Sequence, residues 1–415
     1  MLFSRDTDTG LLQSQRFREK PRASRSGFFP RLGGVAGVIC FLAPGAQALE
    51  INVGYLQWQP HQGPVLSNVF PEPEDSGLRG AELAIEDNLT SGQFLGHDYP
   101  LTTYVAEEEA DLLDAFEEMQ EQDIDLFVAN VPASALIAMA DRLDEGQMLF
   151  NAGARDDHLR GSQCHPQVLH TQPSYAMLTD ALVQWLKLRR WDDVLMITGP
   201  TPQDQAYAEA FRQSVAKFNI TLVEEKEWRF DTDIRRTASS ELPRFTQSKD
   251  YDVVVVADER GDFGEYVPYN TWLPRPVAGT QGLMPVTWHP SIEAWGAVQL
   301  QNRFREHADR NMTGDDYAAW AAIRAIGEAV TRSGESQAPR LYDYLFSDDF
   351  ELGAHKGRKL TFREWNGQLR QPIALVHPRA LVAQAPFEGY LHQHTDLDTL
   401  GQDAPQSECS IEARW

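Results

Sequence analysis

Hydrophobic residues between positions 51 and 152 fall into short apolar runs separated by amphipathic stretches. Strands are predicted at 51–56, 99–105, 125–130 and 148–152, and helices at 77–89, 110–122 and 133–143. In the stretch 110–122 the acidic residues lie opposite the apolar ones, which is typical of a helix that covers a core. Strands that alternate with helices predict a parallel sheet with helices on both faces.

The chain after residue 172 repeats this alternation. Strands are predicted at 194–198, 221–228, 252–257 and 276–279, and helices at 175–190, 204–218, 235–247, 291–302 and 315–332. Near the end, Asn366-Gly367 lies between predicted strands at 359–365 and 373–377, and this dipeptide is typical of a two-residue hairpin turn. The predicted fold class is therefore α/β, with two lobes that exchange the chain more than once.

The first 48 residues have a different character. An arginine-rich segment precedes the apolar run at 32–42 and the ending Ala46-Gln47-Ala48. These are the three parts of a secretory signal peptide, with cleavage predicted after Ala48. The run is too short for a permanent transmembrane helix. Ile39 precedes Cys40 where a lipoprotein would have a small residue, so a soluble periplasmic protein is expected.

Two cysteines, Cys164 and Cys409, remain after removal of the signal peptide. In an oxidising compartment such a pair predicts one disulfide bond, which would fix the C-terminal tail to the first lobe. Two free thiols are the alternative.

Charge and motifs exclude several functions. The net charge of −24 argues against binding to nucleic acids or anionic membranes, which requires basic patches. The sequence has no nucleophile elbow, no His-Glu-x-x-His, no Cys-x-x-Cys, no P-loop and no dinucleotide-binding glycine motif. The acidic run at 107–114 lacks the spacing of a calcium loop and is predicted to be a solvated helix face. We therefore predict a protein that is not an enzyme and holds no cofactor or metal.

Ligands of open α/β sheets bind beyond the carboxyl ends of the strands. This rule selects Trp58, Asp258-Glu259, and residues 130–134, 153–155 and 199–204. Those segments, in that order, resemble the periplasmic substrate-binding proteins of the leucine/isoleucine/valine type, which serve ABC transporters. Further similar segments are 80–87 (GAELAIED), 144–155 (DEGQMLFNAGAR) and 173–211.

The resemblance implies the type 1 periplasmic binding fold, in which two Rossmann-like lobes with parallel sheets are joined by a multi-strand hinge. The expected division is a signal peptide at 1–48, lobe 1 at 49–172 and 281–345, lobe 2 at 173–280 and 346–385, and a tail at 386–415. Less common segments narrow the resemblance to the subgroup associated with PQQ-dependent alcohol dehydrogenase systems. They are 288–290 (WHP), 299–304 (QLQNRF), 367–372 (GQLRQP) and 392–401 (HQHTDLDTLG).

The resemblance implies a periplasmic solute-binding component of an ABC transporter linked to PQQ-dependent alcohol oxidation. A small organic solute would be trapped by lobe closure. The implied partners are the transporter permease and a quinoprotein dehydrogenase system. The alternative is a periplasmic sensor or accessory protein that passes its ligand state to a membrane or dehydrogenase partner.

At several ligand-binding positions of the family, this sequence has a different residue. Ser134 follows the third strand, and Gly153 and Ala154 lead to Arg155 after the fourth. Gln203 stands near the place of a family tyrosine. The complete set of expected ligand-binding residues is Trp58, Ser134, Gly153, Ala154, Arg155, Gln203, Asp258 and Gln281.

The charge of the ligand follows from two of these positions. In the family, an acid after the last strand of lobe 2 pairs with the ligand ammonium, and here the neutral Gln281 occupies that place. Loss of that acid and gain of Arg155 predict a neutral or anionic ligand, with Arg155 contacting a carboxylate if one is present. In the alternative, Arg155 pairs with Asp156 or Asp157 and lies outside the cleft.

Overall fold

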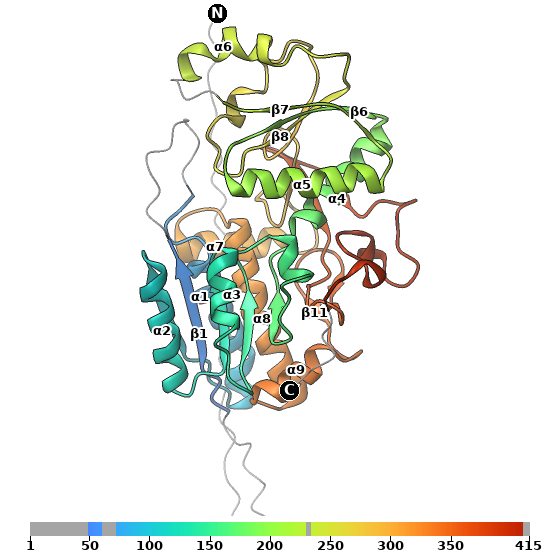
Figure 1. Cartoon of the computed structure of the whole chain (residues 1–415). Coiled ribbons are helices and arrows are strands. Elements are labelled where there is room, and N and C mark those ends of the chain that lie inside the picture. The colour runs from blue at the N-terminus through green and yellow to red at the C-terminus, as the bar shows by residue number, and fades with distance from the viewer. Residues whose placement is uncertain (1–48, 60–71, 230–233, 410–415) are drawn as a thin grey trace, which may run out of the picture. The chain divides into compact units, whose positions relative to one another are not determined.

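The computed structural model describes residues 49–59, 72–229 and 234–409 (Figure 1). The signal peptide predicted at 1–48 lies outside the described residues. Within the described ranges, no helix combines the length and the apolar character that crossing a membrane requires.

The first half of the chain builds a five-stranded parallel sheet with the strand order β2-β1-β3-β4-β5. Its strands are β1 (Val53–Trp58), β2 (Leu101–Ala106), β3 (Leu126–Asn130), β4 (Met148–Asn151) and β5 (Val168–His170). The four strands predicted here are confirmed. The fifth has only three residues, too few to give a periodic signal.

Alternate side chains of this sheet face two separate cores. Tyr55 of β1 and Phe150 of β4 face one core, and their neighbours Leu56 and Leu149 face the other. The first core is covered by α1 (Leu78–Leu95), α7 (Ala297–Ala308), α8 (Gly314–Ser333) and α9 (Ala338–Leu345), and the second by α2 (Glu109–Glu121) and α3 (Ala133–Ala140).

Helices α1 and α8 pack unusually closely. The side-chain amide of Asn88 in α1 donates to the carbonyl of Ile323 in α8, at 2.9 Å. Near the start of both helices, a Cβ on Gly80 would lie 1.9 Å from the carbonyl oxygen of Asp316, so only glycine fits there. This contact fixes the first turn of α8 against the sheet.

The second half builds a four-stranded parallel sheet with the order β7-β6-β8-β9. Its strands are β6 (Asp193–Thr198), β7 (Thr221–Glu227), β8 (Val253–Ala257) and β9 (Val277–Gly279). Figure 1 shows α4 (Tyr175–Arg189) and α5 (Pro202–Lys217) on one face and α6 (Ile234–Phe245) on the other. All four strands predicted after residue 172 up to 279 are confirmed, as is the helix cover on both faces.

The remaining strands are antiparallel. A three-stranded sheet has the order β10 (Met284–Val286), β13 (Ile373–His377), β14 (Ala380–Ala385), and a two-stranded one pairs β11 (Leu352–Gly353) with β12 (Lys359–Leu360). Short 3-10 helices lie at Asp157–Arg160, Gly264–Tyr266, Asp396–Thr399 and Ala404–Gln406. Of these strands, only the segments containing β12 and β13 were predicted.

Two predicted elements are wrong in detail. Helix α7 begins at Ala297 rather than at 291, because Trp295 and Gly296 adopt φ angles of 58° and 80°, which no right-handed helix contains. The expected hairpin at Asn366-Gly367 is also wrong. β13 pairs with β10 and β14, not with residues 359–365. The chain turns instead between Arg363 and Gln368, whose backbone atoms are hydrogen-bonded at 2.9 Å.

The predicted disulfide between Cys164 and Cys409 is confirmed, with a Cα–Cα distance of 5.7 Å. A second anchor of the tail is Asp398, which accepts hydrogen bonds from Arg363 Nε and Arg370 Nε, both at 2.9 Å. Because Arg363 is hydrogen-bonded to Asp398, the tail helps to hold the turn at 363–368, which replaces the expected hairpin.

Candidate functional site

The guanidinium of Arg155 lies between two carboxylates that come from distant parts of the chain. Arg155 Nη1 is 3.2 Å from Glu259 Oε2, and Nη2 is 3.3 Å from Asp315 Oδ1. Arg155 follows β4 of the five-stranded sheet, Glu259 follows β8 of the four-stranded sheet, and Asp315 lies in the first turn of α8. The expected alternative, pairing of Arg155 with Asp156 or Asp157, is therefore wrong.

Neutral side chains hold one oxygen of each acid. The hydroxyl of Tyr175 donates to Glu259 Oε2 at 3.2 Å, and Gln172 Nε2 donates to Asp315 Oδ1 at 2.7 Å. Gln172 is itself fixed by a hydrogen bond from Thr287 Oγ1, at 3.1 Å. Among the described residues, nothing donates to the second oxygens, Glu259 Oε1 and Asp315 Oδ2.

The backbone positions of the two acids are set by helix N-termini. Helix α5 begins with a capping box of Thr201 and Asp204, and Asp204 Oδ1 also accepts the backbone N–H of Glu259 at 2.7 Å. Helix α8 begins with a capping box of Thr313 and Asp316, which places Asp315 at the positive end of the helix dipole. Each acid is thus held by its local fold before any ligand is present.

A third acid, Glu72, belongs to the same neighbourhood. It is exposed, and its Oε1 accepts a hydrogen bond from Ser76 Oγ at 2.7 Å. Burial by itself would lower the pKa of Arg155, but the charges of Asp315, Glu259 and Glu72 raise it above its ordinary value. We name Glu72, Glu259 and Asp315, grouped around Arg155, the acidic cluster.

Electrostatics in the acidic cluster are unbalanced, because three carboxylates face one guanidinium. Burial raises the pKa of Glu259, and the charge of Arg155 opposes the rise. Burial likewise raises the pKa of Asp315, again opposed by Arg155. Both acids remain partly accessible, with 15% and 25% of their side chains exposed, so a solute can reach them.

The structure gives Asp258 a different task from the one expected. Its carboxylate accepts the backbone N–H groups of Asp262, Phe263 and Gly264 at 2.9, 2.8 and 2.6 Å. These bonds shape the loop after β8 and leave the next residue, Glu259, to face Arg155. The strand-end rule selected the pair, but the sequence does not tell which of two adjacent acids turns inward.

Four other expected ligand residues have no hydrogen-bonding role in the acidic cluster within the described part of the chain. Trp58 Nε1 donates to the carbonyl of Glu107 at 3.0 Å, and Ser134 and Gln203 are exposed. Gln281 is half-buried, close to Gly264. None of these four is hydrogen-bonded to the cluster among the described residues.

Gly153 and Ala154 shape the backbone that leads to Arg155. Their N–H groups donate to Asn151 Oδ1 at 3.1 and 2.9 Å. A Cβ on Gly153 would lie 2.6 Å from the backbone nitrogen of Val131, so a larger residue would not fit there. Both residues therefore position Arg155 in the strand-end loop.

Sequence reasoning missed Asp315, Tyr175 and Gln172. The sequence does contain a signal for Asp315. Thr313 and Asp316 have the spacing of a capping box, which marks the start of a helix, and Asp315 lies in the first turn of that helix. Trp288, the first residue of the segment 288–290, belongs to the core. It is 3% exposed and stacks on Tyr317 with ring centroids 4.9 Å apart.

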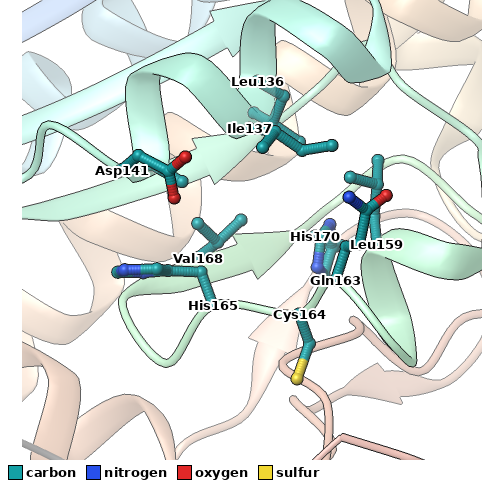
Figure 2. Close-up of a pocket in the computed structure, with 10 residues that line it drawn as sticks. Leu136, Ile137, Asp141, Leu159, Gln163, Cys164, His165, Val168 and His170 are labelled. Atoms are coloured by element: carbon teal, nitrogen blue, oxygen red, sulfur yellow. The ribbon is translucent and has the colours of Figure 1, made fainter.

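A separate pocket of about 230 Å³ lies between α3 and the segment around β5 (Figure 2). Figure 2 shows Leu136 and Ile137 on one side of it and His165 and Val168 on the other. Its volume is below the range of about 300–1,000 Å³ typical of ligand pockets. No member of the acidic cluster lines it, so it is a second and distinct candidate for a ligand.

Metal binding finds no support in this geometry. Within residues 49–59, 72–229 and 234–409, no three His, Cys, Asp or Glu side chains are arranged to hold an ion.

Residues 66–264 match the family model described as periplasmic binding protein. The matched segment, slightly less than half of the chain, is similar to that family. The description of this family names a binding protein rather than an enzyme, in agreement with the prediction from sequence. No curated protein sequence matches the chain.

Solved structures of such binding proteins share the fold. A branched-chain amino acid ABC transporter periplasmic ligand-binding protein from Burkholderia xenovorans is 14% identical, with 88% of this chain and 100% of that chain covered and a TM-score of 0.69. An ABC transporter substrate-binding protein from Desulfitobacterium hafniense in complex with Leu is 15% identical, with coverage of 81% and 100% and a TM-score of 0.62.

A solute-binding protein of an ABC transporter from R. palustris in complex with benzoate is 12% identical, with coverage of 86% and 99% and a TM-score of 0.62. At these identities the likeness establishes the fold. It is the type 1 periplasmic binding fold with two parallel sheets, as predicted.

Proposed function

We propose that this protein is the periplasmic solute-binding component of an ABC transporter and that it traps a small organic solute at the acidic cluster. One observation carries the proposal. Arg155 joins an acid that follows the four-stranded sheet to a loop that follows the five-stranded sheet. A solute at that point contacts residues of both sheets, as lobe closure requires.

The free energy that drives lobe closure comes from the solute. A solute shifts the protein toward the closed state only if it binds that state more tightly than the open one. Residues 49–172 and 281–345 would form one lobe, and 173–280 and 346–385 the other. With Arg155, Glu259 and Asp315 divided between these lobes, closure completes the set of polar contacts.

The ligands named for the relatives support a small organic solute. Leucine and benzoate are bound by similar proteins of this fold. Both are compact molecules with an apolar body and a charged end, which suits a site with a few buried polar groups.

The transporter permease is then the expected partner. The finer assignment, a link to PQQ-dependent alcohol oxidation and a quinoprotein dehydrogenase system, rests on the sequence segments at 288–290, 299–304, 367–372 and 392–401. The last of these contains Asp398, which anchors the tail. A well-anchored tail also offers a fixed surface to a protein partner, which favours the second candidate function, a sensor or accessory protein.

A ligand screen tests the proposal. Protein purified from the periplasm would be titrated with amino acids, amines, short alcohols, aldehydes, carboxylates and pyrroloquinoline quinone. Tryptophan fluorescence and thermal stability would be followed together. All ten tryptophans lie after residue 48, and a solute that binds the folded state raises the melting temperature. A saturable response to one class supports solute binding. A folded, ligand-free protein that responds to none contradicts it and favours the sensor or accessory role.

A further inference from the structure

The charges around Arg155 leave the acidic cluster with an excess of negative charge. Other acids nearby already have partners: Asp316 is paired with Arg310 Nη1 at 2.6 Å, and Asp258 accepts three backbone N–H groups. Arg155 is the only cation shared by Glu259 and Asp315 among the described residues. One oxygen of each of these two acids therefore remains available.

A buried hydroxyl gives a second and independent observation. Tyr207 of α5 is 2% exposed, and its hydroxyl has no hydrogen-bond partner among the described residues. Its ring packs edge-on against Tyr175, the residue that holds Glu259, with centroids 5.9 Å apart. Burial, and then the charge of Glu259, raise the pKa of Tyr207. An unpaired buried hydroxyl is unfavourable, because it loses its hydrogen bond to water on burial.

Arg155 adds a third unsatisfied group, because its Nε is buried without a partner. The acidic cluster thus has two free carboxylate oxygens and one free donor, Arg155 Nε, and the unpartnered hydroxyl of Tyr207 belongs to the ring that packs against Tyr175. A solute that fits these groups has a positively charged group and, next to it, a hydrogen-bond acceptor.

We infer that the solute of this site is an organic cation whose ammonium or guanidinium group lies against Glu259 and Asp315. This inference rests on the proposed function, that is, on the acidic cluster being the solute site. It replaces the anionic or neutral ligand expected from the sequence. An anion would enter a site where Arg155 is already neutralised by two acids, and its charge would be left unpaired.

A charge series on one skeleton tests the inference. The leucine skeleton is suitable because a relative of this fold binds leucine. The probes are leucinamide (cation), leucine (zwitterion), 4-methylpentanamide (neutral) and 4-methylpentanoate (anion). A second series consists of benzylamine, benzyl alcohol and benzoate, because another relative binds benzoate. Affinities are measured by calorimetry on the whole protein.

The expected result is that the cation of at least one series binds at least tenfold more tightly than its neutral and anionic counterparts. Glu259→Gln and Asp315→Asn should each weaken the cation at least tenfold and leave the neutral probe unchanged. Glu121→Gln, an exposed acid of α2 outside the cluster, is the matched control and should change nothing. Retained binding of the neutral probe shows that the variants are folded.

Three results would overturn the inference. Tightest binding of leucine, an anion or a neutral probe contradicts the cationic class but supports solute binding. Cation binding that is insensitive to both variants places the ligand elsewhere. Failure of every probe, with a folded protein, contradicts the cationic class, and the wider ligand screen then decides separately whether the protein binds a solute at all.

Discussion

Arg155 and Glu259, 104 residues apart in the chain, form an ion pair of 3.2 Å between the loop after β4 and the loop after β8. Each side chain is less than one-third exposed. The pair therefore links the carboxyl ends of strands that belong to two different sheets.

A double-mutant cycle measures this link. We expect Arg155→Met and Glu259→Gln to show a coupling of about 1–2 kcal/mol in the free energy of unfolding, because the pair is partly shielded from water. The matched control is Arg142–Glu117, a pair of similar length, 3.2 Å, with side chains 42% and 59% exposed. It should couple by less than about 0.5 kcal/mol. Equal coupling in the two pairs would show that the cluster has no special electrostatic environment.

The stability contribution of Asp315 should depend on pH. Burial raises its pKa in the folded protein, so the folded state holds the proton more firmly than the unfolded chain does. As pH rises from the ordinary pKa of an aspartate through the raised one, this group makes the protein less stable. Asp315→Asn should remove that loss. Urea unfolding between pH 4 and 7 should therefore show a smaller decline with rising pH in the variant than in the wild type. Parallel curves for the two proteins would contradict a raised pKa of Asp315 in the folded protein.

Close packing of α1 on α8 should be essential for the site. A Cβ on Gly80 would overlap the carbonyl of Asp316, so Gly80→Ala should lower the free energy of unfolding by about 1–3 kcal/mol. Because Asp315 is the adjacent residue, solute affinity should fall as well. Gly353→Ala is a suitable control, since nothing lies within 4 Å of its added Cβ. A Gly80→Ala protein with unchanged stability and affinity would mean that α8 tolerates displacement.

The disulfide should stabilise the protein mainly through the unfolded chain. Cys164 and Cys409 are separated by 245 residues, so the bond closes a very long loop. We expect Cys164→Ser/Cys409→Ser to lose about 2–5 kcal/mol in the free energy of unfolding, measured in urea. The tail also has the Asp398 contacts with Arg363 and Arg370, so solute affinity should change little. A large loss of affinity would instead place the tail in the binding mechanism.

The sequence predicted the fold far better than the site. The strands β1 to β4 and β6 to β9 and most helices follow from hydrophobic periodicity, which reports local burial. Arg155 was found because it follows a strand. Its partner Glu259 was selected only together with Asp258, because the choice between these two acids depends on backbone hydrogen bonds within a loop. Asp315 lies in a helix 160 residues after Arg155, and hydrophobic periodicity gives no information about a contact between these two residues.

The most direct test of the account is hydrogen–deuterium exchange of the whole protein with and without a solute found in the ligand screen. The two candidate sites involve different backbone segments. Binding at the acidic cluster should protect residues 153–157, 258–264 and 313–317 together, and leave residues 136–141 of α3 unchanged. Protection confined to 136–141 and 159–170 would place the solute in the pocket of Figure 2 and contradict the proposed site.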